Sequence, residues 1–343
     1  MSDPLLTSLL REVSRSFYLT LRALPGAVRP QIGLAYLLAR TTDTIADTEL
    51  APVESRLEAL AALRTAIRAE SGPPPDFSRL RGGPAPPAER VLLERCHESL
   101  GLLRGLEEAD RRRVRDVLDI IISGQELDLT RFAAATPGRI VALETDEELD
   151  DYTYRVAGCV GEFWTRMCRA HSLTDAAAED GWLLCQGIRF GKGLQLINIL
   201  RDLPRDLRQG RCYLPRTALA AAHLTPADLL SAENESRFRP VFDPFLARAA
   251  GHLAAGWEYT GRLPRGQFRL RLACAWPLLI GARTLRKLRR ENILDATRRV
   301  KITRPEVYSL ILRSILLHPW PAAWSAQLDR ELGAQAGPNE PPK

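Results

Sequence analysis

Residues 191–215 read GKGLQLINILRDLPRDLRQGRCYLP, and this stretch decides which fold the sequence predicts. Its polar residues follow one another at intervals of three, four and four: Gln195, Asn198, Asp202 and Asp206. In a helix these positions share one face, and leucines and isoleucines occupy the others. Two amides and two carboxylates on an otherwise apolar helix are costly to bury without partners. The stretch therefore predicts a buried helix whose polar face meets a polar ligand and cations.

A second stretch, residues 33–48, reads GLAYLLARTTDTIADT and has the same design. Its polar residues lie at intervals of four, three and four: Tyr36, Arg40, Asp43 and Asp47. Taken alone, this stripe also fits a solvated helix face on which Arg40 pairs with one of the two aspartates. Two helices with matching stripes favour a shared ligand instead.

The two aspartate pairs indicate which ligand to expect. Carboxylates at i and i+4 lie about 6 Å apart on one helix face and destabilise a bare helix by a few tenths of a kcal/mol. Mg²⁺ prefers oxygen ligands and often binds through a few carboxylates together with substrate phosphates. The pairs Asp43–Asp47 and Asp202–Asp206 therefore predict a magnesium site for diphosphate chemistry.

Composition excludes several other classes of protein. The 343 residues are 45% apolar and 26% charged, as in ordinary globular proteins. The net charge of +6 is spread along the chain without a basic tail or finger motif, so we expect no nucleic-acid partner. The six cysteines form no CxxC pair and the histidines no i, i+4 pair, which argues against zinc and a disulfide framework.

The sequence also gives expectations for location. The N-terminus lacks the charged and apolar regions of a signal peptide, and no uncharged apolar stretch of 18 residues exists. We therefore expect a cytoplasmic protein without a transmembrane segment, most simply a monomer. The apolar faces within residues 276–288 and 307–317, bounded by Arg and Lys, fit either core helices or peripheral contact with a membrane.

The periodicity predicts an all-α fold. Apolar residues recur at intervals of three and four, and the alternation typical of strands is scarce. One predicted helix begins before Val114 and ends near Gly124, and the Pro- and Gly-rich residues 71–88 are interpreted as a loop between helices. We predict one domain over residues 1–330 and a polar, frayed tail over 331–343.

One glycine-rich stretch imitates a phosphate-binding loop. GIRFGKG, residues 187–193, has three residues between its first two glycines where a P-loop has four, and Gly193 where Ser or Thr would bind Mg²⁺. No G-x-G-x-x-G follows a predicted strand, so a Rossmann dinucleotide site is not expected.

Taken together, these motifs resemble the squalene and phytoene synthases, which join two prenyl diphosphates head to head. The resemblance runs from about Ser14 to Arg304. SRSFYLTLRALP at 14–25 looks like the family's opening segment, and DTIAD at 43–47 and DLPRD at 202–206 like its two aspartate-rich motifs. YTYRVAGCVG at 152–161 is similar to its Y-x-x-x-V-A-G-x-V-G stretch. CAWPLLIGARTL at 274–285 and RVKITR at 299–304 resemble the squalene branch.

The resemblance implies an isoprenoid-synthase-type helical bundle around a central apolar cavity. It implies Mg²⁺ bound by Asp43, Asp47, Asp202 and Asp206, and leaving diphosphate neutralised by Arg40, Arg201 and Arg211. It implies substrate positions lined by Ser14, Phe17, Tyr36, Gln195 and Asn198. Tyr152 matches the tyrosine to which proton removal or cation steering is assigned, and Lys301 and Arg304 would contact the phosphates of NADPH.

The activity implied is that of a squalene synthase. Two farnesyl diphosphates would condense to presqualene diphosphate, which NADPH-dependent rearrangement and reduction would convert to squalene. Alternatives are a non-reducing synthase that makes dehydrosqualene, phytoene or presqualene diphosphate, and a non-catalytic homologue that acts in assembly.

Three residues depart from the family's pattern. Ala46 and Arg205 stand where relatives often have a further acid, so each motif has two carboxylates and a less negative charge. Pro204 lacks the N–H that would bond back to Leu200, and it is expected to kink or end the helix between Asp202 and Asp206.

Overall fold

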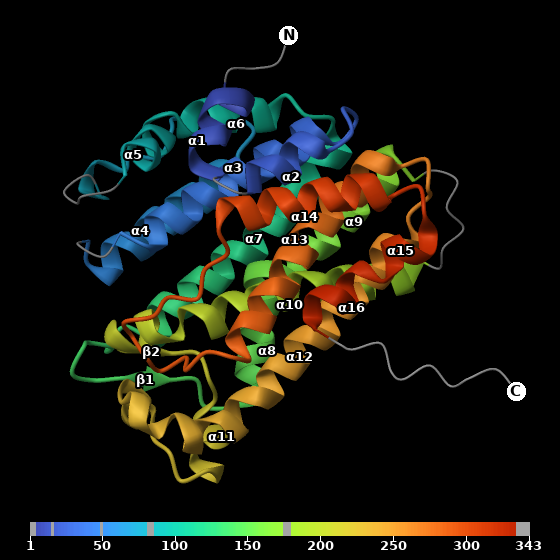
Figure 1. Cartoon of the computed structure of the whole chain (residues 1–343). Coiled ribbons are helices and arrows are strands. Elements are labelled where there is room, and N and C mark those ends of the chain that lie inside the picture. The colour runs from blue at the N-terminus through green and yellow to red at the C-terminus, as the bar shows by residue number, and fades with distance from the viewer. Residues whose placement is uncertain (1–4, 15–16, 49–50, 81–85, 174–179, 334–343) are drawn as a thin grey trace, which may run out of the picture.

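The computed structural model describes residues 5–14, 17–48, 51–80, 86–173 and 180–333. Within these residues the chain forms a bundle of helices, which confirms the predicted all-α class (Figure 1). The only strands in the described part of the chain are two residues long, and they pair in parallel, Val141 opposite Arg211 and Ala142 opposite Cys212.

The elements follow one another in a fixed order along the chain. They are the π-helix η1 (Leu5–Leu9), α1 (Leu10–Ser14), α2 (Phe17–Ala23), α3 (Arg29–Ala46), α4 (Val53–Arg68), the 3₁₀ helix η2 (Ser78–Leu80), α5 (Pro87–Glu94), α6 (Cys96–Arg104), α7 (Glu108–Arg131), β1 (Val141–Ala142), α8 (Asp146–Thr153), the π-helix η3 (Tyr154–Gly158), α9 (Cys159–His171), α10 (Asp180–Arg208), β2 (Arg211–Cys212), α11 (Arg216–Ala221), the 3₁₀ helices η4 (Pro226–Leu230) and η5 (Ala232–Asn234), α12 (Glu235–Arg262), α13 (Phe268–Leu288), α14 (Arg304–Leu317), α15 (Pro321–Ser325) and α16 (Gln327–Leu332).

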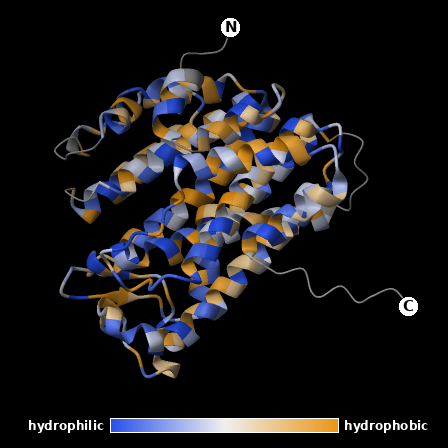
Figure 2. Cartoon of the chain, viewed as in Figure 1, coloured by the Kyte–Doolittle hydropathy of each residue, from blue (hydrophilic) through white to orange (hydrophobic). Residues whose placement is uncertain are grey.

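Helix α10 lies at the centre of the bundle. It packs against α9 and η3 on one side and against α12 and α13 on the other. Helix α7 packs against α3, α4, α9 and η3, so it links the N-terminal helices to the central ones. Two large clusters of buried apolar side chains result, one around α3, α7 and α9 and one around α10, α12 and α13. Hydrophobic and hydrophilic residues alternate along most of the ribbons, as amphipathic helices require (Figure 2).

Glycines allow the central helices to approach one another closely. A Cβ on Gly161 would lie 1.8 Å from the carbonyl oxygen of Gly187, and one on Gly191 would lie 2.1 Å from that of Ala157. Gly187 and Gly191 belong to the GIRFGKG stretch, which lies inside α10. Its glycines therefore serve contact between helices, in agreement with the expectation that it is not a phosphate loop.

The predicted helix end near Gly124 is wrong, and of the two expectations for Pro204, a kink or an end of the helix, the structure excludes the end. Helix α7 continues past Gly124 to Arg131, because this glycine packs closely against Arg155 and Val156 and does not terminate the helix. Helix α10 likewise continues through Pro204 to Arg208. The side chains of Leu203 and Leu207, each 1% exposed, anchor this last part in the core and offset the missing backbone hydrogen bond.

The predicted single domain fits the continuous packing of the described residues, but its boundary at residue 330 remains a prediction. Of the predicted tail, residues 331–333 complete α16 and its C-cap at Gly333. Residues 334–343 lie outside the described part of the chain.

Replacing Gly161 tests the close approach of α9 and α10. We expect Gly161→Ala to lower the free energy of unfolding by at least about 3 kcal/mol, because the new methyl group overlaps backbone atoms that cannot rotate away. Thermal unfolding followed by circular dichroism measures the change. Gly251→Ala in α12 is the matched control: it has open space around the new Cβ and should stabilise the protein by about 0.5–1 kcal/mol. Equal effects of the two changes would refute the packing argument.

Candidate active site

An apolar cavity of about 360 Å³ lies between the helices of the bundle. Aromatic side chains from α2, α3, α9, α10 and α12 contribute to its wall: Phe17, Tyr36, Phe163, Trp164, Phe190 and Tyr259. The rings of Phe17 and Tyr36 stack with their centroids 5.1 Å apart. The polar residues Asp43 and Asn198 also line the wall, so the cavity is apolar with a polar portion.

A polar pocket of about 200 Å³ shares Asn198 with this cavity. Asp47 from the end of α3 and Asp206 from α10 both line it, although they are far apart in sequence. The other polar lining residues are Tyr152, Gln195, Arg205, Gln209, Arg211 and Tyr213. The structure thus brings one aspartate of each predicted motif to the same pocket.

Asp43, the third residue of the polar stripe on α3, has two polar neighbours. Gln125 of α7 donates a hydrogen bond of 2.6 Å to its carboxylate, and the Arg40 guanidinium lies 3.7 Å away. Arg40 is shared, because it also pairs with Glu89 at 2.6 Å. The Asp43 side chain is 47% exposed, and Asp43 lines the apolar cavity. Burial, and secondarily the charge of Asp47, raises its pKa to about 6.

Three more carboxylates have raised pKa values for the same reason. Burial, and then the charge of Asp202, raises the pKa of Asp206 to about 7. Burial raises the pKa of Asp128 to about 6, even though Arg211 lies 3.5 Å from its carboxylate. The pKa of Asp47 is raised by burial too, and Arg40 and Arg211 oppose the shift. Arginines oppose each of these shifts, but desolvation is the largest cause in every case.

Tyr152 lies beside these carboxylates, at the end of α8. It is 8% exposed, and its ring stacks on Tyr213 with the centroids 4.9 Å apart. Tyr213 donates a 3.2 Å hydrogen bond to Asp128. Burial, and then the charge of Asp128, holds the pKa of Tyr152 well above its ordinary value. Tyr152 is therefore a neutral phenol at physiological pH.

The site has the chemistry to hold a divalent cation together with an anionic ligand. Within the described residues, no group of three or more His, Cys, Asp or Glu side chains forms a complete metal site. Mg²⁺ commonly uses only one or two carboxylates and takes its other ligands from water and substrate phosphates. Asp47 and Asp206 meet this need, and one oxygen of Asp128, Oδ1, is buried without a hydrogen-bond partner in the described structure.

Several predicted site residues lie elsewhere. Ser14 is buried, and its hydroxyl donates to the Leu10 carbonyl of its own helix. Asp202 forms an ion pair with its neighbour Arg201 rather than lining either described pocket. Lys301 and Arg304 are exposed and also line neither of these two pockets. Gln195, Asn198, Tyr152 and Arg211 all line the polar pocket, and the roles that the resemblance implies for them remain predictions.

The sequence reasoning missed four residues that complete the site. They are Glu89, Gln125, Asp128 and Tyr213. For two of these residues the sequence gives an indication of a shared helix face. Gln125 and Asp128 are three residues apart on α7 and form a short polar stripe.

Comparison with known proteins decides the family. The family model described as squalene/phytoene synthase matches residues 10–306. The chain belongs to the squalene/phytoene synthase family. Its relatives include the presqualene diphosphate synthase of Rhodopseudomonas palustris, which is 32% identical over 250 residues, 73% of this chain and 76% of that protein. The squalene synthase of Schizosaccharomyces pombe is 25% identical over 314 residues, 90% of this chain and 64% of that protein.

The fold agrees with this membership. The structure of TcSQS with the ligand E5700 superposes with a TM-score of 0.76 at 22% identity, over 97% of this chain and 92% of that chain. This chain spans only 32–40% of the bifunctional lycopene cyclase/phytoene synthases that it also matches. Proteins of the family are head-to-head prenyl synthases that act on farnesyl diphosphate and related substrates, and the chain is accordingly a transferase of isoprenoid biosynthesis. None of its described helices is both long and apolar enough to cross a membrane.

Removing the charge of Asp206 tests the electrostatic description. The pKa of Asp206 rises from 3.8 to about 7 on folding, so the folded state binds more protons and the charge destabilises it as the pH rises through this range. We therefore expect Asp206→Asn, without metal, to raise the free energy of unfolding by roughly 1–2 kcal/mol near pH 8 and by much less near pH 5.

Thermal unfolding at the two pH values measures this difference. Asp329→Asn on the exposed side of α16 is the control, and we expect it to change stability equally at both. A gain for Asp206→Asn that does not depend on pH would contradict the assignment of Asp206 as a buried charge.

Proposed function

We propose that this protein is a squalene synthase that condenses two farnesyl diphosphates to presqualene diphosphate and then reduces this intermediate to squalene with NADPH. One observation carries the proposal: a polar pocket that contains Asp47 and Asp206, one aspartate of each motif, shares Asn198 with a cavity that has aromatic walls. The pocket fits the diphosphate ends of the substrates together with Mg²⁺, and the cavity fits their prenyl chains.

The first half-reaction forms carbon–carbon bonds from one allylic cation. One farnesyl diphosphate loses diphosphate, its C1 is attacked by the double bond of the second molecule, and loss of a proton closes the cyclopropane of presqualene diphosphate. Asp43, Asp47 and Asp206 would hold Mg²⁺, which when bound neutralises the departing diphosphate. Arg40 and Arg211 add positive charge at the same end, and the aromatic wall stabilises the cation and excludes water.

Tyr152 has the properties that the proton step requires. It is buried between the carboxylates and the cavity residues, and as a neutral phenol it offers no anion for the cation to alkylate. Its oxygen can accept the proton lost on ring closure and pass it toward Tyr213 and Asp128, beside which it lies.

The second half-reaction requires a hydride, which NADPH would supply as presqualene diphosphate loses its diphosphate and rearranges. Lys301 and Arg304 are the residues proposed to contact the phosphates of NADPH. They are exposed, and the neighbouring Val300 is buried in the same apolar cluster as Tyr152 and Tyr213. This cluster connects the proposed cofactor segment to the wall of the polar pocket.

A second candidate product is presqualene diphosphate itself. The relative with the highest identity quoted above carries the name presqualene diphosphate synthase. The same pocket and cavity serve the first half-reaction in either case, so the two candidates differ only in the use of NADPH.

Product analysis distinguishes the two candidates. The purified protein is incubated with farnesyl diphosphate and Mg²⁺, with and without NADPH, and the extracts are analysed by mass spectrometry. We expect presqualene diphosphate without NADPH and squalene with it. Presqualene diphosphate under both conditions would assign the protein to the non-reducing branch, and dehydrosqualene would do so with a different product. Phytoene would require a C20 diphosphate, so a parallel incubation with geranylgeranyl diphosphate tests for it. Diphosphate binding without turnover would indicate a non-catalytic homologue.

Asp128 provides a test of the site itself. We expect Asp128→Asn to lower kcat/KM for the first half-reaction by about 10- to 100-fold, because it removes a charge that faces Asp47 and Asp206, and higher Mg²⁺ should restore part of the loss. Asp119→Asn is the matched control on the same helix, since Asp119 pairs with Arg68 away from the site at 2.6 Å. Identical kinetics for the two variants would exclude Asp128 from the active site.

A further inference from the structure

Helix α14 and the residue that precedes α15 present an apolar face to solvent. Tyr308 is 59% exposed, Leu312 58%, Leu316 58% and Trp320 62%. Tyr308, Leu312 and Leu316 recur at intervals of four, so they follow one side of the helix, and Trp320 comes just after the turn that ends it. Together they include most of the strongly exposed large apolar side chains in the described structure. We call Tyr308, Leu312, Leu316 and Trp320 the α14 face. Hydrophobic colouring dominates the C-terminal half of this ribbon (Figure 2).

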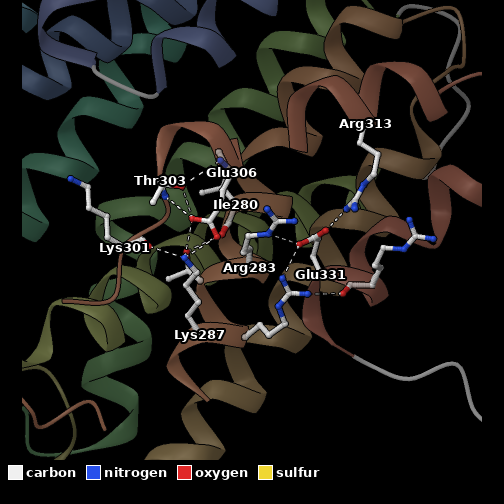
Figure 3. Close-up of polar contacts among 11 residues, drawn as sticks. Ile280, Arg283, Lys287, Lys301, Thr303, Glu306, Arg313 and Glu331 are labelled. Atoms are coloured by element: carbon white, nitrogen blue, oxygen red, sulfur yellow. Dashed lines mark hydrogen bonds and ion pairs between the residues drawn. The ribbon is translucent and has the colours of Figure 1, made fainter. Parts of the chain in front are cut away.

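The opposite side of α14 is firmly attached to the bundle. Ser314 is fully buried and accepts a 2.9 Å hydrogen bond from the Trp276 indole. Near the start of the helix Glu306 pairs with Lys287 at 2.9 Å, and near its end Arg313 pairs with the buried Glu331, as Figure 3 shows. The helix therefore has a defined orientation, and its exposed apolar face is not the result of loose packing.

The charges near the α14 face are mainly positive, because its nearest acids, Glu306 and Glu331, are paired with basic side chains. Residues 307–328 contain no aspartate or glutamate. The segment that leads into α14 carries exposed basic residues, and Arg299, Lys301 and Arg304 have no ion-pair partner in the part of the chain that the structure describes. In Figure 3 the Lys301 side chain points away from the cluster of ion pairs. An apolar face with positive flanks matches an anionic lipid surface, whereas a second copy of the chain would bring the same positive charge to the contact.

The types of side chain favour lipid as well. Tyr and Trp combine an apolar ring with a polar group and are the residues preferred at the membrane–water interface. Here Tyr308 and Trp320 lie at the two ends of the face, with Leu312 and Leu316 between them. This order suits a helix that lies in the plane of the interface, with leucines among the acyl chains.

We propose that the α14 face binds the surface of a bilayer that contains anionic phospholipid. The position of the face gives this contact a use, and this one point rests on the proposed function. Helix α14 packs on α13, and its Ile311 packs against the same small buried cluster as Leu19 and Ala23 of α2. Both α2 and α13 line the apolar cavity, so α14 lies between the wall of the cavity and the proposed bilayer surface.

Vesicle binding by the full chain, without any substrate, tests the proposal independently of the catalytic activity. Sedimentation compares vesicles of phosphatidylcholine alone with vesicles of equal parts phosphatidylcholine and phosphatidylglycerol. We expect binding to the anionic vesicles, weaker at high salt, and a loss of affinity of about tenfold for each leucine replaced in Leu312→Gln/Leu316→Gln. The substitutions leave the basic residues in place, since Lys301 and Arg304 are also proposed to contact NADPH.

Leu230→Gln is the matched control, because Leu230 is 49% exposed in η4 and distant in sequence from the α14 face. It should bind vesicles as the unchanged protein does, and circular dichroism should show that all variants are folded. Two results would overturn the proposal: no binding of the unchanged protein to anionic vesicles, or equal binding by the α14 variant. A dimer in sedimentation equilibrium that dissociates on Leu312→Gln/Leu316→Gln would assign the face to a second copy instead.

Discussion

The structure depends on one electrostatic constraint, the gathering of carboxylates at the end of an apolar cavity. Asp43, Asp47, Asp128 and Asp206 all have raised pKa values, chiefly because burial disfavours their charged forms. The nearby guanidinium groups oppose these shifts without cancelling them, because desolvation is the larger effect. Charge of this kind lowers stability and persists where a site requires it. A cation bound with an anionic substrate is the partner that would remove the penalty.

The interior helices hold these carboxylates in place, and α7 contributes contacts to both aspartate motifs. This helix supplies Gln125 to Asp43 of α3 and also carries Asp128, which meets Arg211 and Tyr213 beyond the end of α10. It therefore connects the two aspartate motifs, which lie on different helices. Gly124 lets α7 approach the η3 segment closely, and other glycines bring α9 against α10. Close helix packing and the geometry of the site are consequently the same property of the bundle.

The sequence predicted the parts of this arrangement that follow from periodicity. Polar stripes at helical spacing identified Asp47, Asn198 and Asp206, and the all-α class followed from the apolar pattern. Asp128 was not predicted as a site residue because α7 is rich in charged residues. The sequence around a carboxylate does not distinguish one that faces a pocket from one on the surface. Asp202 shows the reverse case: its spacing fits the stripe, but its carboxylate pairs with the adjacent Arg201, and periodicity does not specify that orientation of the side chain. The continuation of α10 through Pro204 likewise depends on the burial of Leu203 and Leu207, and the intrinsic helix propensity of proline does not take such burial into account.

The arrangement of polarity also bears on the order of events in the proposed reaction. Each loss of diphosphate removes the group that the carboxylate pocket and its arginines would hold through Mg²⁺, so the final hydrocarbon keeps only its contacts with the cavity wall. A neutral hydrocarbon gains nothing from leaving such a cavity for water, because its apolar surface would be exposed again. Release therefore requires an apolar acceptor. The cavity is lined by α2 and α13, and the outer layer over these two helices is α14, whose free side is apolar with basic flanks. Substrate binding and product release thus use opposite properties of the fold, charge at one end and apolar surface at the other.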